Sequence, residues 1–174
     1  MNLTDKILMV RPNTFRSNEQ TIINNYFQKA DSKIDDKDVF TKALKEFDDL
    51  TSIISKNNIE ITVVDGSKLY DNPDEIFPNN WIVFDNNKIG IFPMNAINRR
   101  TEINNDLINK INKKNKYKII DYSNYVEKNI FLEGTGSVVL DRASKKAYCA
   151  LSERSSKNLF LKFCIDFDYK PIIF

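Results

Sequence analysis

The sequence predicts an α/β fold built from a repeated unit of two strands, a helix and a strand. The order hairpin, helix, strand occurs twice in the second half of the chain. Arg99 and Arg154, each placed between a hairpin and a helix, lie 55 residues apart. A repeat of about 50 residues is typical of propellers and similar arrays, whose units cannot bury their apolar faces alone. We therefore expect an α/β propeller of ββαβ units, about three of which fit into 174 residues.

The first of these units is incomplete. Lys6–Val10 (KILMV) predicts a short buried strand, and Asp38–Lys56 predicts an amphipathic helix. Ile59–Val64 (IEITVV) predicts the next strand, which Asp65-Gly66 closes. The apolar stripe of the helix comprises Val39, Phe40, Ala43, Leu44, Phe47, Leu50, Ile53 and Ile54. The unit lacks its leading strand, as expected if the C-terminus of a closed ring supplies it.

The second unit is complete. Trp81–Phe84 and Lys88–Phe92 predict a hairpin around Asp85-Asn86-Asn87, whose residues tolerate a left-handed backbone. Thr101–Lys113 predicts a helix and Tyr117–Asp121 a strand. The helix residues expected to face inward are Ile103, Leu107, Ile108 and Ile111.

The third unit repeats this order. Ser137–Leu140 and Lys146–Leu151 predict a hairpin, Ser156–Ile165 a helix, and Lys170–Phe174 the start of a strand. Phe174 then ends the chain in mid-strand.

Composition and charge describe one globular domain. Hydrophobic residues make up 41% and charged residues 29% of the chain, which argues against disorder. The formal charge of +2 is nearly balanced and the lysines are scattered, whereas nucleic-acid binding needs a clustered basic face. Since no apolar run approaches the ~20 residues of a membrane span, and Met1–Val10 is too short for a secretory signal, we expect a cytoplasmic protein without nucleic-acid or membrane partners.

Histidine is absent, and the two cysteines predict no reactive site. Cys149 lies in a strand pattern and Cys164 near the end of a helix pattern, so both are expected to be reduced thiols packed as small hydrophobes. Neither has a CxxC partner, and a metal site would have to form without histidine. We therefore expect no metal and no cofactor.

The segment Phe131–Ser156 (FLEGTGSVVLDRASKKAYCALSERSS) carries the clearest functional signal. Glu133 is followed by Gly-Thr-Gly, and glycines beside an acid let the backbone pass close to a bound group. A carboxylate at a strand end can bind a guanidinium through two parallel hydrogen bonds. Arg154 follows the second hairpin, where a helix should begin. The alternative for Glu133 is a surface acid before a glycine turn.

This segment and three others resemble the amidinotransferase and deiminase superfamily, the guanidino-group-modifying enzymes of pentein fold. The three are Met9–Gln28 (MVRPNTFRSNEQTIINNYFQ), Phe77–Trp81 (FPNNW) and Phe92–Arg100 (FPMNAINRR). The order and the sequences of these segments look most like those of the citrulline-utilisation hydrolase group. Penteins are rings of five ββαβ units, so the resemblance implies a pentein-type α/β propeller in which residues 1–174 form a partial domain of about three units.

The resemblance also implies roles for single residues. In the family a cysteine attacks the central carbon of a guanidino or ureido group, a histidine moves protons, and acids bind the nitrogens. Glu133 matches the glutamate of the family's Glu-Gly block, which typically hydrogen-bonds the nitrogens and helps the histidine, so the resemblance implies a catalytic role for Glu133. Asn80 stands where many relatives place an aspartate, and its neutral amide suits the neutral urea of citrulline. The alternative for Asn80 is to cap a turn before Trp81, which itself is expected in the core.

Arginines supply the remaining candidates. Relatives use arginines after hairpins to bind the carboxylate of an amino-acid substrate, and Arg154, Arg99 and Arg100 are in such places. Arg11, after the first strand, is a weaker candidate. The alternative is a surface ion pair with Glu102 or Glu153, which would contribute little to stability.

Together these expectations describe the N-terminal part of a hydrolase. The C–N bond of citrulline or an arginine derivative would be cleaved by Cys-His covalent catalysis, and the family's nucleophile and histidine have no counterpart in this chain. The chain stops at KPIIF, just before the family's His-Thr-Asn motif, so we expect a fragment, a disrupted gene or a second polypeptide that completes the ring. The alternative is a non-catalytic binding or assembly module of the same fold, as a homo-oligomer or with a complementing chain.

Overall fold

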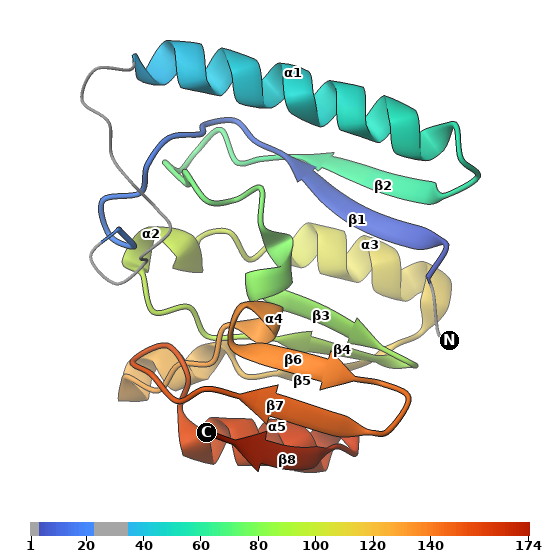
Figure 1. The fold of residues 1–174 in the computed structure, drawn as a ribbon, viewed down its shortest axis with the longest axis vertical. Coiled ribbons are helices and arrows are strands. Elements are labelled where there is room, and N and C mark those ends of the chain that lie inside the picture. The colour runs from blue at the N-terminus through green and yellow to red at the C-terminus, as the bar shows by residue number, and fades with distance from the viewer. Residues whose placement is uncertain (1–3, 23–34) are drawn as a thin grey trace. The chain divides into compact units, whose positions relative to one another are not determined.

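The computed structural model describes residues 4–22 and 35–174, and it divides into two compact units (Figure 1). One unit extends to Pro78 and the other spans Asn79–Phe174. The last part of the Met9–Gln28 block, from residue 23 on, lies outside the described residues. Each unit is described by itself.

The unit that extends to Pro78 contains a two-stranded parallel sheet. β1 (Lys6–Arg11) pairs in register with β2 (Glu60–Asp65), and α1 (Asp36–Ser55) lies between them in the sequence. Neighbouring parallel strands need a long crossover, which a helix commonly provides. α1 begins two residues before the expected start because the Asp35 side chain caps it, accepting a hydrogen bond of 2.9 Å from the Lys37 backbone N–H. The predicted strand, helix and strand are thus confirmed.

The apolar stripe expected along α1 is only partly buried. Phe47 is the buried residue of this helix, at 5% exposure. Leu50 and Ile53 are 48% and 59% exposed, so the predicted stripe is not buried along its whole length. The sheet that α1 packs against has two strands, and its width covers less than the full stripe.

Polar groups hold the loops of this unit. The Glu75 carboxylate accepts hydrogen bonds from the backbone N–H groups of Asn13 (2.6 Å) and Ser67 (2.9 Å), and its burial raises the pKa of this carboxyl. Arg16 donates two hydrogen bonds to Asp71, at 2.7 and 2.6 Å, which holds the pKa of Asp71 below its usual range. These contacts join the loop after β1 to the loop after β2.

The unit Asn79–Phe174 begins with a three-stranded sheet. β3 (Ile82–Asp85) and β4 (Lys88–Ile91) form the predicted hairpin, and β5 (Lys118–Asp121) pairs parallel to β4 after the crossover helix α3 (Asn105–Asn115). This helix begins four residues later than expected. A short helix, α2 (Ile97–Arg100), precedes it, and the Asn104 side chain caps α3 by accepting from the Leu107 N–H at 2.9 Å.

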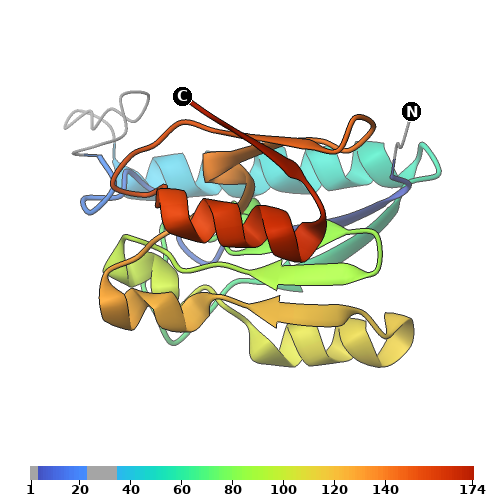
Figure 2. The same ribbon diagram turned by 90° about the horizontal axis from the view of Figure 1, so that it is seen from below.

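A second sheet repeats this order. β6 (Val138–Asp141) and β7 (Lys146–Cys149) form a hairpin, and β8 (Lys170–Ile173) pairs parallel to β7 after α5 (Lys157–Phe167), as Figure 2 shows. The remaining short helices are η1 (Pro78–Asn80), η2 (Ser123–Lys128) and α4 (Gly134–Ser137). The third predicted unit is therefore confirmed in its elements, with ends shifted by up to two residues.

The two sheets also agree in register. In the first, Asp85 pairs with Lys88 and Lys88 with Lys118. In the second, Asp141, Lys146 and Lys170 pair in the same way. Each row therefore starts with an acid and continues with two lysines on neighbouring parallel strands.

A continuous apolar core joins both sheets of this unit to α5. Its fully buried side chains include Phe92, Tyr122, Leu132, Phe160, Phe163 and Phe167. Two buried tyrosines fix the sheets to each other, since Tyr122 donates to Asp166 at 2.7 Å and Tyr169 donates to Asp85 at 2.9 Å. Trp81 is 1% exposed, which confirms its expected place in the core.

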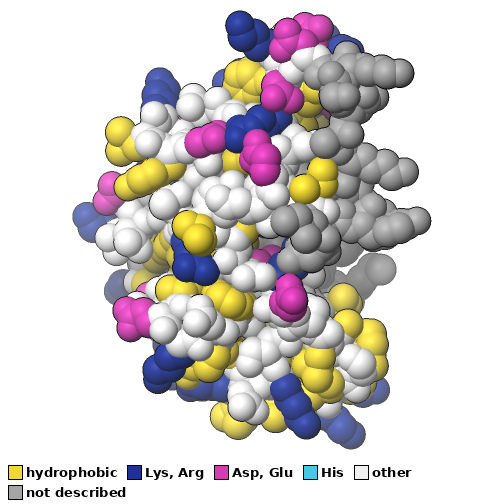
Figure 3. All heavy atoms as spheres, turned by 90° about the vertical axis from the view of Figure 1, so that its left-hand side faces the viewer, with side chains coloured by type: hydrophobic (Ala, Val, Ile, Leu, Met, Phe, Trp, Pro, Cys, Tyr) yellow, Lys and Arg dark blue, Asp and Glu magenta, His cyan; other side chains and the backbone are white. Residues whose placement is uncertain are grey.

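Charged side chains of both signs are interspersed on the face that Figure 3 shows. Among residues 4–22 and 35–174, no helix is both long and apolar enough to cross a bilayer. The same ranges contain no group of three or more potential metal ligands.

We expect Phe163→Ala to lower the free energy of unfolding by about 3–5 kcal/mol, because it leaves a cavity among tightly packed rings. Phe163 is 1% exposed and lies 5.6 Å from the ring of Phe92 and 4.7 Å from that of Phe167, measured between centroids. Urea denaturation followed by circular dichroism measures the change. The matched control is Ile165→Ala on the same helix, at a site 81% exposed, which should shift stability by less than ~0.5 kcal/mol. Equal losses in the two variants would contradict this description of the core.

Candidate active site

Three of the five predicted site residues come together in the unit Asn79–Phe174. The Oε2 atom of Glu133 lies 3.4 Å from Nδ2 of Asn80 and 3.6 Å from Nη1 of Arg154. Asn80 ends η1, Glu133 precedes α4, and Arg154 lies in the loop between β7 and α5. The arrangement combines one carboxylate, one amide and one guanidinium within reach of a small polar ligand.

Glu133 is 2% exposed, and burying a carboxylate is costly unless hydrogen-bond donors or an opposite charge surround it. Its Oε1 atom accepts a hydrogen bond of 3.1 Å from the backbone N–H of Asn95, and Oε2 accepts from Asn80. Hydrogen-bonded and paired in this way, the carboxylate is held in one orientation. The prediction of a surface acid, the alternative for this residue, is wrong.

The Gly-Thr-Gly turn lets the loop of Asn79 and Asn80 approach α4. Gly134 has φ +40°, and a Cβ there would lie 2.4 Å from the carbonyl oxygen of Asn79. A Cβ on Gly136 would lie 2.3 Å from Nδ2 of Asn80. Between them, Thr135 accepts a hydrogen bond of 3.1 Å from the Asn79 amide. Both glycines are therefore needed for Asn80 to reach Glu133.

Arg154 lies three residues before α5 rather than at its first turn. Its loop is fixed by the Ser156 N–H, which donates to the Phe131 carbonyl at 2.8 Å, and by a bridge between Ser155 and Leu132. The side chain of Arg154 is 31% exposed and pairs with Glu133, not with the neighbouring Glu153 that the sequence suggested. Part of the guanidinium thus stays accessible.

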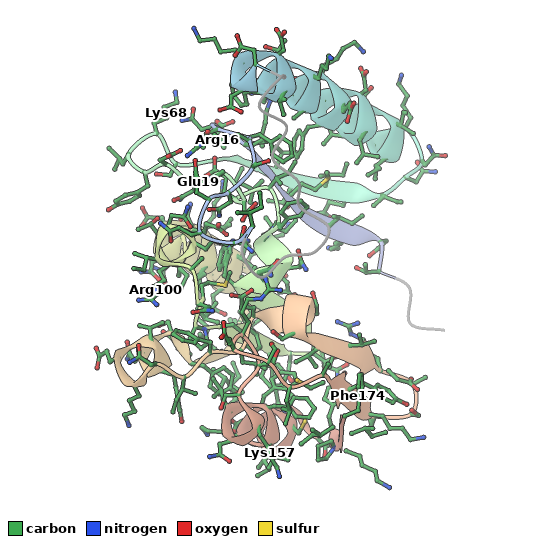
Figure 4. The ribbon with its side chains drawn as sticks, turned by 60° about the vertical axis from the view of Figure 1, so that its left-hand side comes forward. Arg16, Glu19, Lys68, Arg100, Lys157 and Phe174 are labelled. Atoms are coloured by element: carbon green, nitrogen blue, oxygen red, sulfur yellow. The ribbon has the colours of Figure 1, made fainter. Side chains whose placement is uncertain are left out.

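Arg100 binds the backbone next to Glu133. Its Nε and Nη2 atoms donate to the carbonyl oxygens of Met94 (3.0 Å) and Asn95 (2.9 Å), and its guanidinium lies 5.5 Å from the centre of the Phe131 ring. Arg100, labelled in Figure 4, also lines an open hollow of about 440 Å³. Other residues around this hollow are Pro93, Met94, Asn105, Asp121 and Asn124.

Arg99 is not brought to Glu133. It is 4% exposed and donates to both carboxylate oxygens of Glu102, at 2.8 and 2.9 Å. The alternative predicted from the sequence was a surface ion pair with Glu102. The ion pair is present, but both side chains are buried. Arg11 likewise has a local partner, Asp48 of α1, in the other unit.

Several groups at the site were missed by sequence reasoning. The Asn95 N–H binds Glu133, the Asn79 and Thr135 side chains bind each other, and the Ser137 hydroxyl contacts both the Glu133 and the Arg154 backbone. A backbone donor has no signature in a sequence. The Thr and Ser of the Gly-Thr-Gly-Ser run were visible, but the run was interpreted as a turn that leads into a strand.

Neither cysteine is placed to act as a nucleophile. Cys149 and Cys164 are free and buried, as predicted. Burial raises the pKa of the Cys149 thiol, and it raises the pKa of the Cys164 thiol to about 12. Because the thiolate is the reactive form, both groups are expected to be inert at neutral pH.

With this geometry established, the chain was compared with known proteins. Residues 11–174 match the family described as N,N dimethylarginine dimethylhydrolase, eukaryotic. The chain belongs to this dimethylarginine dimethylhydrolase family. Its membership confirms the superfamily predicted from the sequence, while the nearer likeness to the citrulline-utilisation hydrolases stays a prediction. No curated protein matched the chain.

Several solved structures share the α/β fold of this chain. The N-terminal domain of ArgZ, an arginine dihydrolase of cyanobacteria solved with its substrate, aligns with a TM-score of 0.72 at 16% identity, covering 97% of this chain and 56% of that one. The dimethylarginine dimethylaminohydrolase (DDAH) of Pseudomonas aeruginosa, a mutant complexed with citrulline, gives 0.68 at 13%, with 99% and 61% covered. The DDAH adduct with S-methyl-L-thiocitrulline gives 0.67 at 13%, with the same coverage.

These likenesses establish the mixed α/β fold that was expected. At identities this low they concern the fold alone. The chain spans 56% and 61% of the length of these structures.

Arg99→Ala should destabilise the chain by ~3 kcal/mol or more, because it removes one side of the buried, two-bond ion pair with Glu102. Urea denaturation measures the loss. Arg11→Ala, which breaks an exposed pair with Asp48, is the matched control and should have a much smaller effect. A small effect of Arg99→Ala would show that the buried pair does not contribute to stability.

Ellman's reagent should label neither cysteine of the folded chain at pH 8 and both in urea, because the buried thiols stay protonated.

The folded-state pKa of Cys164, about 12, lies above the ~8.5 of an unfolded thiol. Stability from this group is therefore complete below about pH 8.5 and is lost as the pH rises toward 12. Urea unfolding at pH 7, 9 and 10 tests this sign, with Cys164→Ala as the control that should flatten the slope. Rapid labelling of the native chain would contradict the burial described here.

Proposed function

We propose that this chain forms the substrate-binding part of a hydrolase that cleaves a C–N bond of citrulline or an arginine derivative. The observation that carries the proposal is the cluster of Glu133, Asn80 and Arg154. Glu133 would bind a nitrogen of the ureido or guanidino group and assist proton transfer, Asn80 would bind the same group, and Arg154 would bind the substrate carboxylate. Family membership supports this class of reaction.

The charges of the cluster favour a neutral ureido group. The carboxylate of Glu133 already faces the guanidinium of Arg154, so the pair carries no net charge. The amide of Asn80 offers both a donor and an acceptor, which a urea can match on both sides. A guanidinium would compete with Arg154 for the carboxylate, so we expect citrulline to bind at least as well as arginine.

The three candidate arginines have different roles in this proposal. Arg100 lines the hollow beside Met94 and can reach a substrate carboxylate there after releasing a backbone carbonyl. Arg99 is committed to Glu102, and its contribution would be to hold α2 in place. Arg154, whose side chain is 31% exposed, is the best placed of the three to meet a ligand.

The nucleophile and the general base would come from polypeptide other than these 174 residues. The sequence contains no histidine, and both of its cysteines are buried. We propose that the remaining units of a five-unit pentein ring, on a continuing or a complementing chain, supply both groups. The repeated ββαβ order of β3–β5 and β6–β8 supports such a ring.

A second candidate function is a non-catalytic module that binds the ligand and recruits a partner. The inert thiols and the missing histidine favour this function for the chain by itself. Under both functions we expect no turnover of citrulline or arginine by the chain alone.

Isothermal titration of the 174-residue chain with L-citrulline and with L-arginine tests the proposal. We expect millimolar or tighter binding of citrulline without release of ammonia, and a loss of at least tenfold in Glu133→Gln, because a charge-assisted hydrogen bond is removed. The control is Asp141→Asn in the β6–β7 turn, which should leave affinity unchanged. Failure of the wild-type chain to bind either amino acid at concentrations far above the expected millimolar limit would overturn the assignment.

A further inference from the structure

The hydroxyl of Ser137 joins the two chain segments that carry Glu133 and Arg154. It accepts a hydrogen bond of 3.1 Å from the backbone N–H of Glu133 and donates one of 2.9 Å to the backbone carbonyl of Arg154. Ser137 is the last residue of α4, so the bond to Glu133 closes within one turn, whereas the bond to Arg154 spans 17 residues. One hydroxyl therefore fixes the backbone of the acid against the backbone of the arginine.

The spacing that results differs from that of an ordinary ion pair. Nη1 of Arg154 lies 3.6 Å from Oε2 of Glu133, longer than the ~2.7–2.9 Å of a charge-assisted hydrogen bond. The Glu133 carboxylate is also held from its other side by the Asn95 N–H, at 3.1 Å. The hydroxyl of Ser137 thus ties the backbones at both ends of the pair, which limits how far the arginine loop can move relative to the acid.

We propose that Ser137 is a positioning residue of the site, whose hydroxyl sets the distance between the Glu133 carboxylate and the Arg154 guanidinium. The proposal rests on the proposed function, since the distance matters because one ligand would contact both groups. At 3.6 Å the guanidinium keeps hydrogen-bond donors for a ligand carboxylate. If the tie were absent, the arginine loop would move relative to the acid, and a ligand of fixed length would lose one contact.

Serine fits this role because a hydroxyl donates and accepts at once. Alanine can do neither, while threonine keeps the hydroxyl and adds one methyl group. The chain offers a matched control in Ser144, which lies in the turn between β6 and β7. Its hydroxyl donates a hydrogen bond to Asp141 at the end of β6. Ser144→Ala removes a hydroxyl from the same unit without touching the site.

The experiment compares the wild-type chain with Ser137→Ala, Ser137→Thr and Ser144→Ala by two readouts. The first is the NMR resonance of the Arg154 Nε–H group, assigned by its disappearance in Arg154→Lys. The second is the affinity for L-citrulline by titration. We expect Ser137→Ala to shift the Arg154 resonance and to weaken citrulline binding about fivefold, the factor for one lost hydrogen bond. Ser137→Thr should restore both readouts, and Ser144→Ala should change neither.

An unchanged Arg154 resonance and unchanged affinity in folded Ser137→Ala would overturn the proposal, as would equal effects of Ser144→Ala. A loss that Ser137→Thr fails to restore would also count against it, because the hydroxyl would then not be the active feature. If Ser137→Ala does not fold, Ser137→Thr and Ser137→Cys decide, since only the hydroxyl should preserve the wild-type resonance. If the wild-type chain binds no citrulline, the proposed function fails, and the resonance alone still decides whether Ser137 positions Arg154.

Discussion

The buried carboxylate of Glu133 constrains the rest of the unit around it. A charge at 2% exposure is tolerated only where donors surround it, and each donor here comes from a different segment. The Asn95 N–H follows β4, the Asn80 amide precedes β3, and Arg154 follows β7. The two hairpins must therefore hold their ends at fixed positions if the carboxylate is to remain hydrogen-bonded in one orientation. The shared apolar core, with α5 against both sheets, provides this rigidity.

Next to this carboxylate, the Asn79-Asn80 segment and the Gly-Thr-Gly segment of α4 lie against each other. The Asn79-Asn80 loop lies so close to α4 that a methyl group on Gly134 or Gly136 would overlap it. Asn79 and Thr135 then bond side chain to side chain across the contact. The glycines thus act through the contact between two loops, in addition to any approach of a ligand. Binding residues on loops that a rigid scaffold positions are common among enzymes.

Most of the fold could be predicted from the sequence, because apolar runs and hairpin turns are local signals. The hairpin around Asn86 could be predicted from two short apolar runs joined by residues that tolerate a left-handed backbone, and Asn86 has φ 51°. The exposure of Leu50 and Ile53 could not be predicted, since it depends on the width of a sheet formed by distant strands. Of the site, Glu133, Asn80 and Arg154 were found through motifs. Their ties through Asn95 and Ser137 were not, because hydrogen bonds to the backbone arise from tertiary structure. Arg99 and Arg100 illustrate the same limit: neighbours on a helix point about 100° apart, so one is buried with Glu102 while the other reaches Met94.

The matching rows of lysine at the start of both sheets have an electrostatic consequence. Lys88 faces Lys118, and Lys146 faces Lys170, on adjacent parallel strands, so like charges repel at the first rung of each ladder. Dissolved ions screen such repulsion over about 10 Å at 0.1 M. The acid that begins each row, Asp85 or Asp141, attracts the first lysine and offsets part of this repulsion. Added salt therefore weakens the repulsion and the attraction at the same end of each sheet, so the acid and the two lysines of a row respond to ionic strength as one group.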